Sequence, residues 1–466
     1  MRAKERGFGL GASITLTLAS AVLWGVAHLA VDRRKTGVAL MAAYVLMLAA
    51  VLTVLTAFST RLLSVAVQPR WLTGLTAGIV AVALAWTAVI VRSYVLVRPP
   101  RSDAAGRVFS TALTIALCAL VLTPTVYAAR VAHLSRDVVN SLFTTTGGAP
   151  IVANDPWNGA DRVNFLLLGA DAAPGRPGVR TDSMTVASVD VETGATTLFG
   201  LPRNLQRVPL PRGPARDAFP WGFTGTGPQT PGLLNEVFQY AEDHPEVVPG
   251  HQRGQRGPAL IKQTIGDILG IPVSYYAMID MKGFAEIVDA MGGVRVTVKE
   301  PIVYGRHREG LLPAGTRRLT GEQALWYGRS RTDSDDYVRM GRQKCLLNAV
   351  AQQADPLTVL NSFERLAAAT KRAISTDIPQ DLLPALAELA QKVKDSRMRS
   401  LSFVPPLIDT AAPDWSLIRR KVSAALQDRP RSAADTSAHS PAHSPAPGSG
   451  YGALDDDPIN LDAACG

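Results

Sequence analysis

The sequence predicts two parts: an all-α bundle of four transmembrane helices, and then an α/β domain with three α-β-α layers. Two observations carry this prediction. The first third of the 466-residue chain holds four long runs without Asp, Glu, Lys or Arg. Beyond them, short apolar segments alternate with amphipathic ones, which indicates a central sheet between helices. A chain of this length also favours two or more units.

Each apolar run is long enough to cross a membrane. The runs cover residues 7–31, 36–60, 71–91 and 108–129, and a helix needs roughly 20 apolar residues to span the hydrocarbon core. Helices satisfy their backbone hydrogen bonds internally, as lipid requires. A signal peptide is the alternative for the first run, but the run is too long for one and three more follow. We therefore predict four spans within residues 1–134.

The basic residues around these spans do not orient them. Seven Lys and Arg residues flank the spans on each side, so the positive-inside rule is a tie. An even number of spans would still place both ends of the bundle on the same side of the membrane. Much of the net charge of +9 lies in these loops, where anionic membrane lipid is the natural partner. No zinc-finger or basic-helix pattern indicates binding to nucleic acid.

The chain beyond the spans divides into three predicted regions: a stem over residues 135–159, a folded domain over 160–428 and a tail over 429–466. Ser, Pro, Ala, His and Asp dominate the tail, so we expect it to be disordered. Three cysteines are too few for a disulfide framework. Cys118 lies in a predicted span, and the sequence leaves open whether Cys345 and Cys465 are free or paired.

Apolar periodicity and turn residues predict the elements of the domain. The predicted strands are residues 163–169, 184–191, 195–201, 275–280, 294–298 and 400–404. The predicted helices are residues 233–241, 259–269 and 282–291, a short helix from 320, and residues 336–354, 357–370 and 379–394. Thr193-Gly194 makes a turn, so the second and third strands should form a hairpin.

Charged residues gather in the stretch ALWYGRSRTDSDDYVRMGRQ, residues 324–343. Its aspartates could form ordinary surface ion pairs with arginines three to seven residues later on a helix. Alternatively, arginines this close indicate an anionic ligand, because the planar guanidinium suits phosphate. Further charged residues, Asp171, Arg180, Asp182 and Arg203, lie at predicted strand ends, where ligands collect in open α/β sheets.

Two carboxylates beside several arginines suggest a magnesium ion bridging a dianion, because Mg²⁺ prefers hard oxygen ligands. The sequence has no zinc signature, P-loop, dinucleotide fingerprint or nucleophile elbow. These absences argue against chemistry driven by nucleoside triphosphates and against acyl transfer. A domain tethered to the membrane with such residues fits a lipid pyrophosphate.

Six spaced motifs in order resemble the LytR-CpsA-Psr family over about residues 160–425: VNFLLLGAD, RTDSM, LPRN, YYAMIDMKGFAEIVDAMGGV, LTGEQALWYGRSR and DDYVRMGRQ. The resemblance implies an enzyme that moves a glycopolymer from a polyprenyl pyrophosphate carrier to peptidoglycan, with Mg²⁺ as cofactor and Mn²⁺ as the alternative. It also implies a cell-membrane protein whose catalytic domain is extracytoplasmic, which would resolve the orientation of the spans.

The resemblance also implies roles for single residues. The metal ligands would be Asp171 and Asp182. The catalytic arginines would be Arg180, Arg203, Arg329, Arg331, Arg339 and Arg342. The substrate-binding residues would be Asn204, Asn235, Asp336 and Gln343. The family usually has an aspartate at position 204, so any role that needs a carboxylate there is in doubt, because an asparagine carries no charge.

These motifs lead to the hypothesis of phosphoryl transfer without a covalent intermediate, in which arginines stabilise charge on the pyrophosphate. A hydrolase, or a regulator that only binds lipid pyrophosphate, is the alternative that Asn204 keeps open. A membrane sensor is a third class, although the spans hold no acidic or basic relay residue. The prenyl chain would need an apolar groove near residues 233–238 and 346–350, unless these residues are core.

Overall fold

A computed structural model describes residues 8–57, 69–98, 103–143, 155–171, 179–227, 231–305, 307–332, 334–353, 374–427 and 457–465. The chain divides into two compact units, residues 1–139 and 140–466. The predicted helix over residues 357–370 and most of the predicted tail lie outside the described residues. Each unit is considered by itself.

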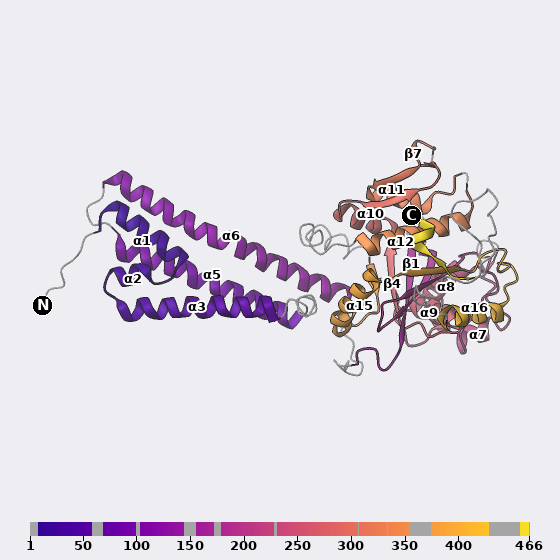
Figure 1. Cartoon of the computed structure of the whole chain (residues 1–466). Helices are drawn as coiled ribbons and strands as arrows, with labels where there is room; N and C mark the ends of the chain where they lie inside the picture. The colour runs from indigo at the N-terminus through magenta and orange to yellow at the C-terminus, as the bar shows by residue number, and fades with distance from the viewer. Residues whose placement is uncertain are drawn as a thin grey trace, which may run out of the picture. The chain divides into compact units, whose positions relative to one another are not determined.

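The described residues of the first unit form helices joined by short connections, in agreement with the predicted all-α bundle (Figure 1). Its helices are α1 (Leu10–Val22), α2 (Val26–Ala30), α3 (Arg34–Ala57), α5 (Pro69–Val97) and α6 (Ala104–Leu142). Three segments are long and apolar enough to cross a membrane: Arg34–Thr53, Thr73–Val97 and Ala104–Val131. They correspond to the second, third and fourth apolar runs.

The first run does not form a fourth span, so the prediction of four is wrong for the described residues. Its helix α1 has 13 residues and is about 20 Å long, shorter than the hydrocarbon core. The helix ends at Val22, because the backbone of Leu23 is extended with φ of −130° and ψ of 108°. Gly25 then adopts a left-handed backbone with φ of 97° before α2 begins. A Cβ atom there would lie 2.3 Å from the carbonyl oxygen of Gly37 in α3. Hydropathy counts apolar residues but does not register such a break.

The second unit is built on a mixed seven-stranded sheet in the order β11-β10-β3-β2-β1-β4-β9. The predicted hairpin is confirmed, because β2 pairs antiparallel with both β1 and β3. Strand β4 runs parallel to β1, and β10 runs parallel to β3. The strands are β1 (Arg162–Asp171), β2 (Arg180–Asp190), β3 (Thr196–Leu201), β4 (Tyr275–Asp280), β9 (Ile374–Thr376), β10 (Met398–Ser402) and β11 (Ile459–Asn460).

Helices cover both faces of this sheet, which gives the three layers expected from the sequence. Alternate side chains of β3 enter different cores, because successive residues of a strand point to opposite faces. Phe199 packs in the large core with α8 (Val237–Asp243), α9 (Arg256–Leu269) and α16 (Trp415–Gln427). Leu198 packs on the other face, in a small cluster with residues of α12 (Asp336–Gln353) and α15 (Leu383–Asp395).

A smaller cluster of elements surrounds α10 (Met281–Ala290) and α11 (Gly321–Arg329). The predicted strand over residues 294–298 is observed as β5, but it pairs with β8 outside the central sheet. The elements that were not predicted from the sequence are α7 (Pro214–Ala218), β6 (Ile302–Tyr304), β7 (Gly310–Leu312), β8 (Gly315–Leu319), β9, α16, β11, α17 (Leu461–Cys465), and the 3-10 turns η1 (Leu234–Glu236), η2 (Pro245–Val247) and η3 (Gln380–Leu382).

Two predicted boundaries differ from the structure. Helix α6 continues to Leu142, so the first residues of the predicted stem are helical, because nothing breaks the helix before the threonines and glycines after 143. The predicted tail is not wholly disordered, because residues 459–465 form β11 and α17. Cys345 and Cys465, left open by the sequence, form a disulfide.

Helix α12 lies against β3 and β10 through a buried lysine. Lys344 is 4% exposed, and its Nζ donates a hydrogen bond to Ser402 Oγ. A Cβ atom at Gly200 would lie 2.8 Å from the same Nζ, so a larger residue there would have to displace the end of this side chain. Burial lowers the pKa of Lys344 to about 7, because desolvation disfavours the ammonium form.

Replacing Lys344 should change how stability depends on pH. Between pH 7 and the ordinary pKa of 10.5, the unfolded chain binds more protons than the folded one, so the free energy of unfolding rises with pH. The burial cost is fully present below pH 7. We expect Lys344→Met to stabilise the protein at pH 6 by about 2–3 kcal/mol, with the gain shrinking toward pH 10.

Chemical unfolding of the full-length protein in detergent at several pH values measures this difference. Lys282→Met is the matched control, because the Lys282 side chain is 89% exposed. Stability curves of the wild type and Lys344→Met that run parallel from pH 6 to pH 10 would contradict the buried neutral lysine.

Candidate functional site

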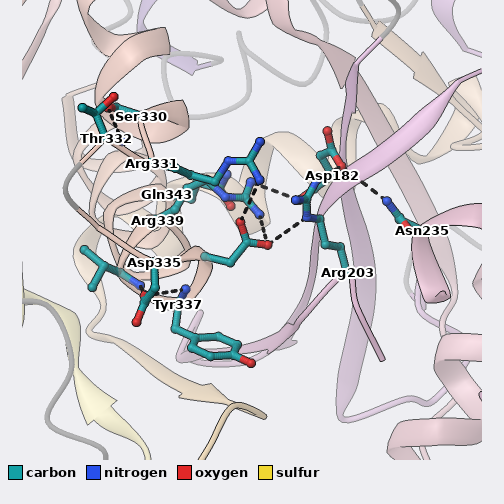
Figure 2. A network of polar contacts seen from close by, with 12 residues as sticks. Asp182, Arg203, Asn235, Ser330, Arg331, Thr332, Asp335, Tyr337, Arg339 and Gln343 are labelled. Atoms are coloured by element: carbon teal, nitrogen blue, oxygen red, sulfur yellow. Dashed lines mark hydrogen bonds and ion pairs between the residues drawn. The ribbon is translucent and has the colours of Figure 1, made fainter. Parts of the chain in front are cut away.

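The site forms where β2 begins and β3 ends. Because Met184 and Leu201 are paired across the hairpin, Asp182 and Arg203, each two residues beyond that pair, lie at the same edge of the sheet. The first turn of α12 approaches this edge and brings Asp336 and Arg339 (Figure 2). Residues far apart in the sequence thus meet at strand ends, as predicted.

Arg203 joins two carboxylates. Its Nη1 lies 2.7 Å from Asp182 Oδ1, and its Nε lies 2.8 Å from Asp336 Oδ2. The three side chains are 18–24% exposed, so these charge-assisted hydrogen bonds are shielded from much of the solvent. They tie the sheet to α12.

Asp336 is shared by two further guanidiniums. Arg339 Nη2 lies 3.4 Å from Asp336 Oδ2, and Arg331 Nη1 lies 3.6 Å from Asp336 Oδ1. Arg339 Nη1 also donates to the backbone oxygen of Asp182 at 3.2 Å. Asp335, which the surface ion-pair interpretation would place in a salt bridge, instead caps α12, because its Oδ1 accepts from the amides of Tyr337 and Val338.

The pKa directions follow from this arrangement. Burial would raise the pKa of Asp336, but the charge of Arg339 and the hydrogen bond and charge of Arg203 outweigh it and lower the pKa. Burial would likewise lower the pKa of Arg203, but Asp182 and Asp336 raise it. Burial dominates for Arg339 and lowers its pKa. Asp336 is therefore ionised at neutral pH.

The cluster of Asp182, Arg203, Arg331, Asp336 and Arg339 carries three positive charges against two negative ones. Arg339 is 5% exposed, and its Nε has no hydrogen-bond partner among the described residues. The Arg331 side chain is 57% exposed, so one guanidinium reaches solvent at the edge of the cluster. A buried surplus of positive charge with an unused donor suits an anion with several oxygens.

Asn235 completes the cluster on the side of η1. It is 5% exposed, its Nδ2 lies 3.5 Å from Asp182 Oδ1, and its backbone amide donates to the oxygen of Arg203. Its Oδ1 has no hydrogen-bond partner in the described part of the chain. This oxygen and the Asp182 carboxylate are the hard oxygens that the described side chains offer here.

Two other predicted residues support the segment that carries Arg331. Gln343 Nε2 donates to the oxygen of Gly328 at 3.0 Å, and Arg342 Nη1 donates to the oxygen of Ser330 at 3.3 Å. The first bond connects α12 to the last turn of α11, and the second connects it to the segment that follows α11. The structure therefore gives Arg342 and Gln343 a bracing position, and the catalytic role of Arg342 and the substrate-binding role of Gln343 stay predictions.

Arg329, the last residue of α11, lies beside an aromatic ring. It is exposed, and its guanidinium lies 5.7 Å from the centre of the Trp326 ring, which is stacked with Tyr304. The sequence analysis did not single out Trp326. Its spacing of three residues before Arg329 on a helix is the signal that could have identified this cation–π pair.

Three predicted residues lie at the margin. The backbones of Asp171 and Arg180 pair at the end of the β1–β2 ladder, and Arg180 is exposed. The Asp171 side chain lies outside the described atoms. The Asn204 side chain contacts Thr410, with its Nδ2 3.4 Å from Thr410 Oγ1.

The expected apolar groove is filled by the core. Leu234 and Val237 are fully buried, Phe238 is 4% exposed and Leu346 is 5% exposed. These residues belong to the main core clusters. The alternative of core packing is therefore correct for them.

The described residues contain no group of three His, Cys, Asp or Glu side chains that could hold a metal. A magnesium ion needs fewer protein ligands, because it is often held by one or two carboxylates together with phosphate oxygens. Asp182 and Asn235 Oδ1, which has no hydrogen-bond partner among the described residues, fit such an arrangement. Asp171 lies on the neighbouring strand opposite Arg180, which precedes Asp182 by two residues.

Two bacterial proteins and one solved structure illustrate what the chain is similar to. It is 25% identical over 224 residues to the polyisoprenyl-teichoic acid–peptidoglycan teichoic acid transferase TagU of Bacillus mycoides, covering 48% of this chain and 62% of that protein. It is 25% identical over 334 residues to biofilm regulatory protein A of Streptococcus mutans, covering 68% and 74%. Protein gbs0355 of Streptococcus agalactiae matches at 22% identity with a TM-score of 0.42, covering 58% and 89%.

The alignment with TagU spans less than two thirds of that protein's length. The sequence model of the LytR_cpsA_psr family matches residues 132–408, which is more than half of this chain. The match contains the hairpin, the arginine cluster and α12, and it confirms the resemblance found in the ordered motifs. The chain belongs to the LytR_cpsA_psr family.

Proposed function

We propose that this protein is a membrane-anchored transferase that moves a glycopolymer from a polyprenyl pyrophosphate carrier to a hydroxyl of peptidoglycan. The observation that carries the proposal is the cluster around Arg203, in which guanidiniums outnumber carboxylates at the strand ends. Membership of the family and the name of the TagU relative support the choice of substrates.

The residues of the cluster suit the binding and orientation of a pyrophosphate. Arg331 reaches solvent and would meet the donor first, while the buried Arg339 would hold the charge that develops on phosphate oxygens. The acceptor hydroxyl oxygen attacks the sugar-proximal phosphorus, the bond to the bridging oxygen breaks and polyprenyl phosphate leaves. The hydroxyl proton passes to solvent. Catalysis of this kind depends on position and charge rather than on a covalent intermediate.

A magnesium ion would be held by Asp182 and Asp171, with Asn235 Oδ1 as a further oxygen. When bound, it would neutralise charge on the pyrophosphate. Asp336 has a different task, because the three arginines around it leave it as an orienting carboxylate.

The location that we propose is the outer face of the cytoplasmic membrane. Three helices are long and apolar enough to anchor the chain in lipid, and the acceptor proposed for the enzyme is peptidoglycan. The disulfide between Cys345 and Cys465 supports this side, because disulfides persist in oxidising compartments.

A hydrolase or a binding regulator is the second candidate, favoured by Asn204 in place of the family aspartate and by the name of the Streptococcus mutans relative. The intact cluster weakens this candidate. Arg203 bridges Asp182 and Asp336 although position 204 carries no charge.

Replacing Arg331 by alanine should reduce transfer by about 100-fold or more, because one transition-state donor is lost. The assay combines the full-length protein in detergent with a lipid-linked donor, Mg²⁺ and uncrosslinked peptidoglycan. Attachment to peptidoglycan supports the ligase, free sugar phosphate supports the hydrolase, and retention without turnover supports the regulator.

Arg420→Ala is the control, because that exposed arginine lies on α16. Full transfer by Arg331→Ala would remove Arg331 from the site.

Asp336→Asn should destabilise the protein at pH 7 by about 1–3 kcal/mol, because three guanidiniums lose their shared carboxylate. The pKa of Asp336 is lowered in the folded state, so its contribution is present above pH 3.8 and is lost as the pH falls further. Unfolding curves should therefore converge on acidification. Equal stability of the two proteins at pH 7 would contradict this role.

Chelation of divalent cations should abolish transfer, and added Mg²⁺ should restore it. Asp182→Asn should then need at least about 10-fold more Mg²⁺ for half-maximal activity, because a neutral amide oxygen binds Mg²⁺ more weakly than the carboxylate that it replaces. The measurement is a titration of the rate with Mg²⁺ in metal-free buffer. A rate that is unchanged by chelation would exclude the metal from the mechanism.

A further inference from the structure

The last described residues of the chain return to the domain and lie beside the helix that carries the arginines. Strand β11 pairs with the edge strand β10, with Ile459 opposite Ser400 and Asn460 opposite Arg399. The short helix α17 follows at once and lies beside α12, as the yellow end of the chain shows in Figure 1. We call residues 457–465 the C-terminal clasp.

Three kinds of contact join the clasp to α12 and to the sheet below it. A disulfide links Cys465 to Cys345 of α12, across 120 residues of sequence. Asp462 Oδ1 accepts hydrogen bonds from Gln352 Nε2 at 2.7 Å and from Asn348 Nδ2 at 3.2 Å. Leu461 is 2% exposed and packs in the small cluster on this face of the sheet.

Helix α12 meets this face of the sheet with a buried amine among its apolar side chains. Lys344 and Met340 both lie beside Gly200 of β3, and Lys344 also contacts Ser402 of β10. The apolar residues that α12 adds to the cluster on this face, Leu347 and Ala351, are only partly buried. The buried residues of that cluster are Ala187, Leu198, Met398 and Leu461, and the last of these belongs to the clasp. The clasp thus adds a buried apolar residue and a covalent link to the contacts that the helix makes itself.

The same helix positions the cluster at its other end. Asp336 and Arg339 lie in the first turn of α12, and Cys345 follows Asp336 by nine positions. A helix moves as a rigid rod over this length, so a shift at Cys345 displaces both charged groups relative to Arg203 and Asp182. Hydrogen bonds of 2.7–2.8 Å do not survive a displacement of an ångström.

We propose that the C-terminal clasp is a disulfide-locked positioning element that holds α12 at the distance at which Asp336 and Arg339 complete the anion site around Arg203. It contacts no substrate. Reduction by a dithiol converts the bond between Cys345 and Cys465 into two thiols, while the reductant becomes a cyclic disulfide. Anion binding is then weakened by release of the helix. The activity readout rests on the proposed function, but the binding and exchange readouts do not.

The test uses the full-length protein in detergent and compares oxidised wild type with wild type in dithiothreitol, with Cys465→Ser and with Cys118→Ser. Cys118 is the free cysteine of α6, so it is the matched control for loss of a sulfur. The double variant Cys345→Ala with Cys465→Ala provides a second open form without a buried hydroxyl. Each state is probed by the dissociation constant for inorganic pyrophosphate and by amide hydrogen exchange of residues 336–353.

The reduced wild type, Cys465→Ser and the double variant should bind pyrophosphate about 10- to 100-fold more weakly and exchange faster in the first turn of α12. Cys118→Ser should match the oxidised wild type, and dithiothreitol should leave Cys465→Ser unchanged. In the transfer assay, the open forms should show a raised KM for the lipid donor.

Equal pyrophosphate affinity and equal exchange of α12 in the oxidised and reduced proteins would overturn the proposal. A lower unfolding temperature with unchanged affinity would overturn it as well, because it would show a stabilising role alone. If pyrophosphate binding responds but no transfer occurs in any state, the clasp stands and the proposed transferase activity fails.

Discussion

The site depends on one interaction, the bridge that Arg203 makes between Asp182 of the sheet and Asp336 of α12. Without the guanidinium, the two carboxylates would repel each other. Helix α12 would then lose its fixed position against β2 and β3. Because the three side chains are only partly exposed, solvent screens the bridge weakly. The positions of Arg331 and Arg339 follow from it, since both meet the same Asp336.

The charged residues of the cluster have two different roles, structural support and the binding of a ligand. Asp336 neutralises part of the guanidinium charge and stays ionised, because its pKa is lowered. Arg339 is held against Asp336 and the Asp182 backbone, and Arg331 reaches solvent. The uncompensated charge is thus fixed in place before a ligand arrives, which is the condition for electrostatic stabilisation of a phosphoryl transfer.

Several parts of this arrangement were predictable. The hairpin of β2 and β3, the strand β4 and the helices α10 and α12 follow from local apolar patterns, and Asp182, Arg203 and Asp336 follow from their places at strand ends and in ordered motifs. The contacts of Arg342 with Ser330 and of Asn204 with Thr410 were not predictable, because they depend on where α11 and the 410 loop pack. The break at Gly25 depends on the approach of Gly37, which hydropathy does not contain.

The sequence by itself determined the family, the apolar helices, the three-layer α/β domain and the residue types of the site, because periodicity and motif order are local properties. The tertiary structure alone decided that Arg203 joins Asp182 to Asp336 and that Cys465 is bonded to Cys345. These partners are separated by up to 133 residues. Only the packing of α12 against the sheet brings such distant segments within bonding distance, so no local pattern could specify them.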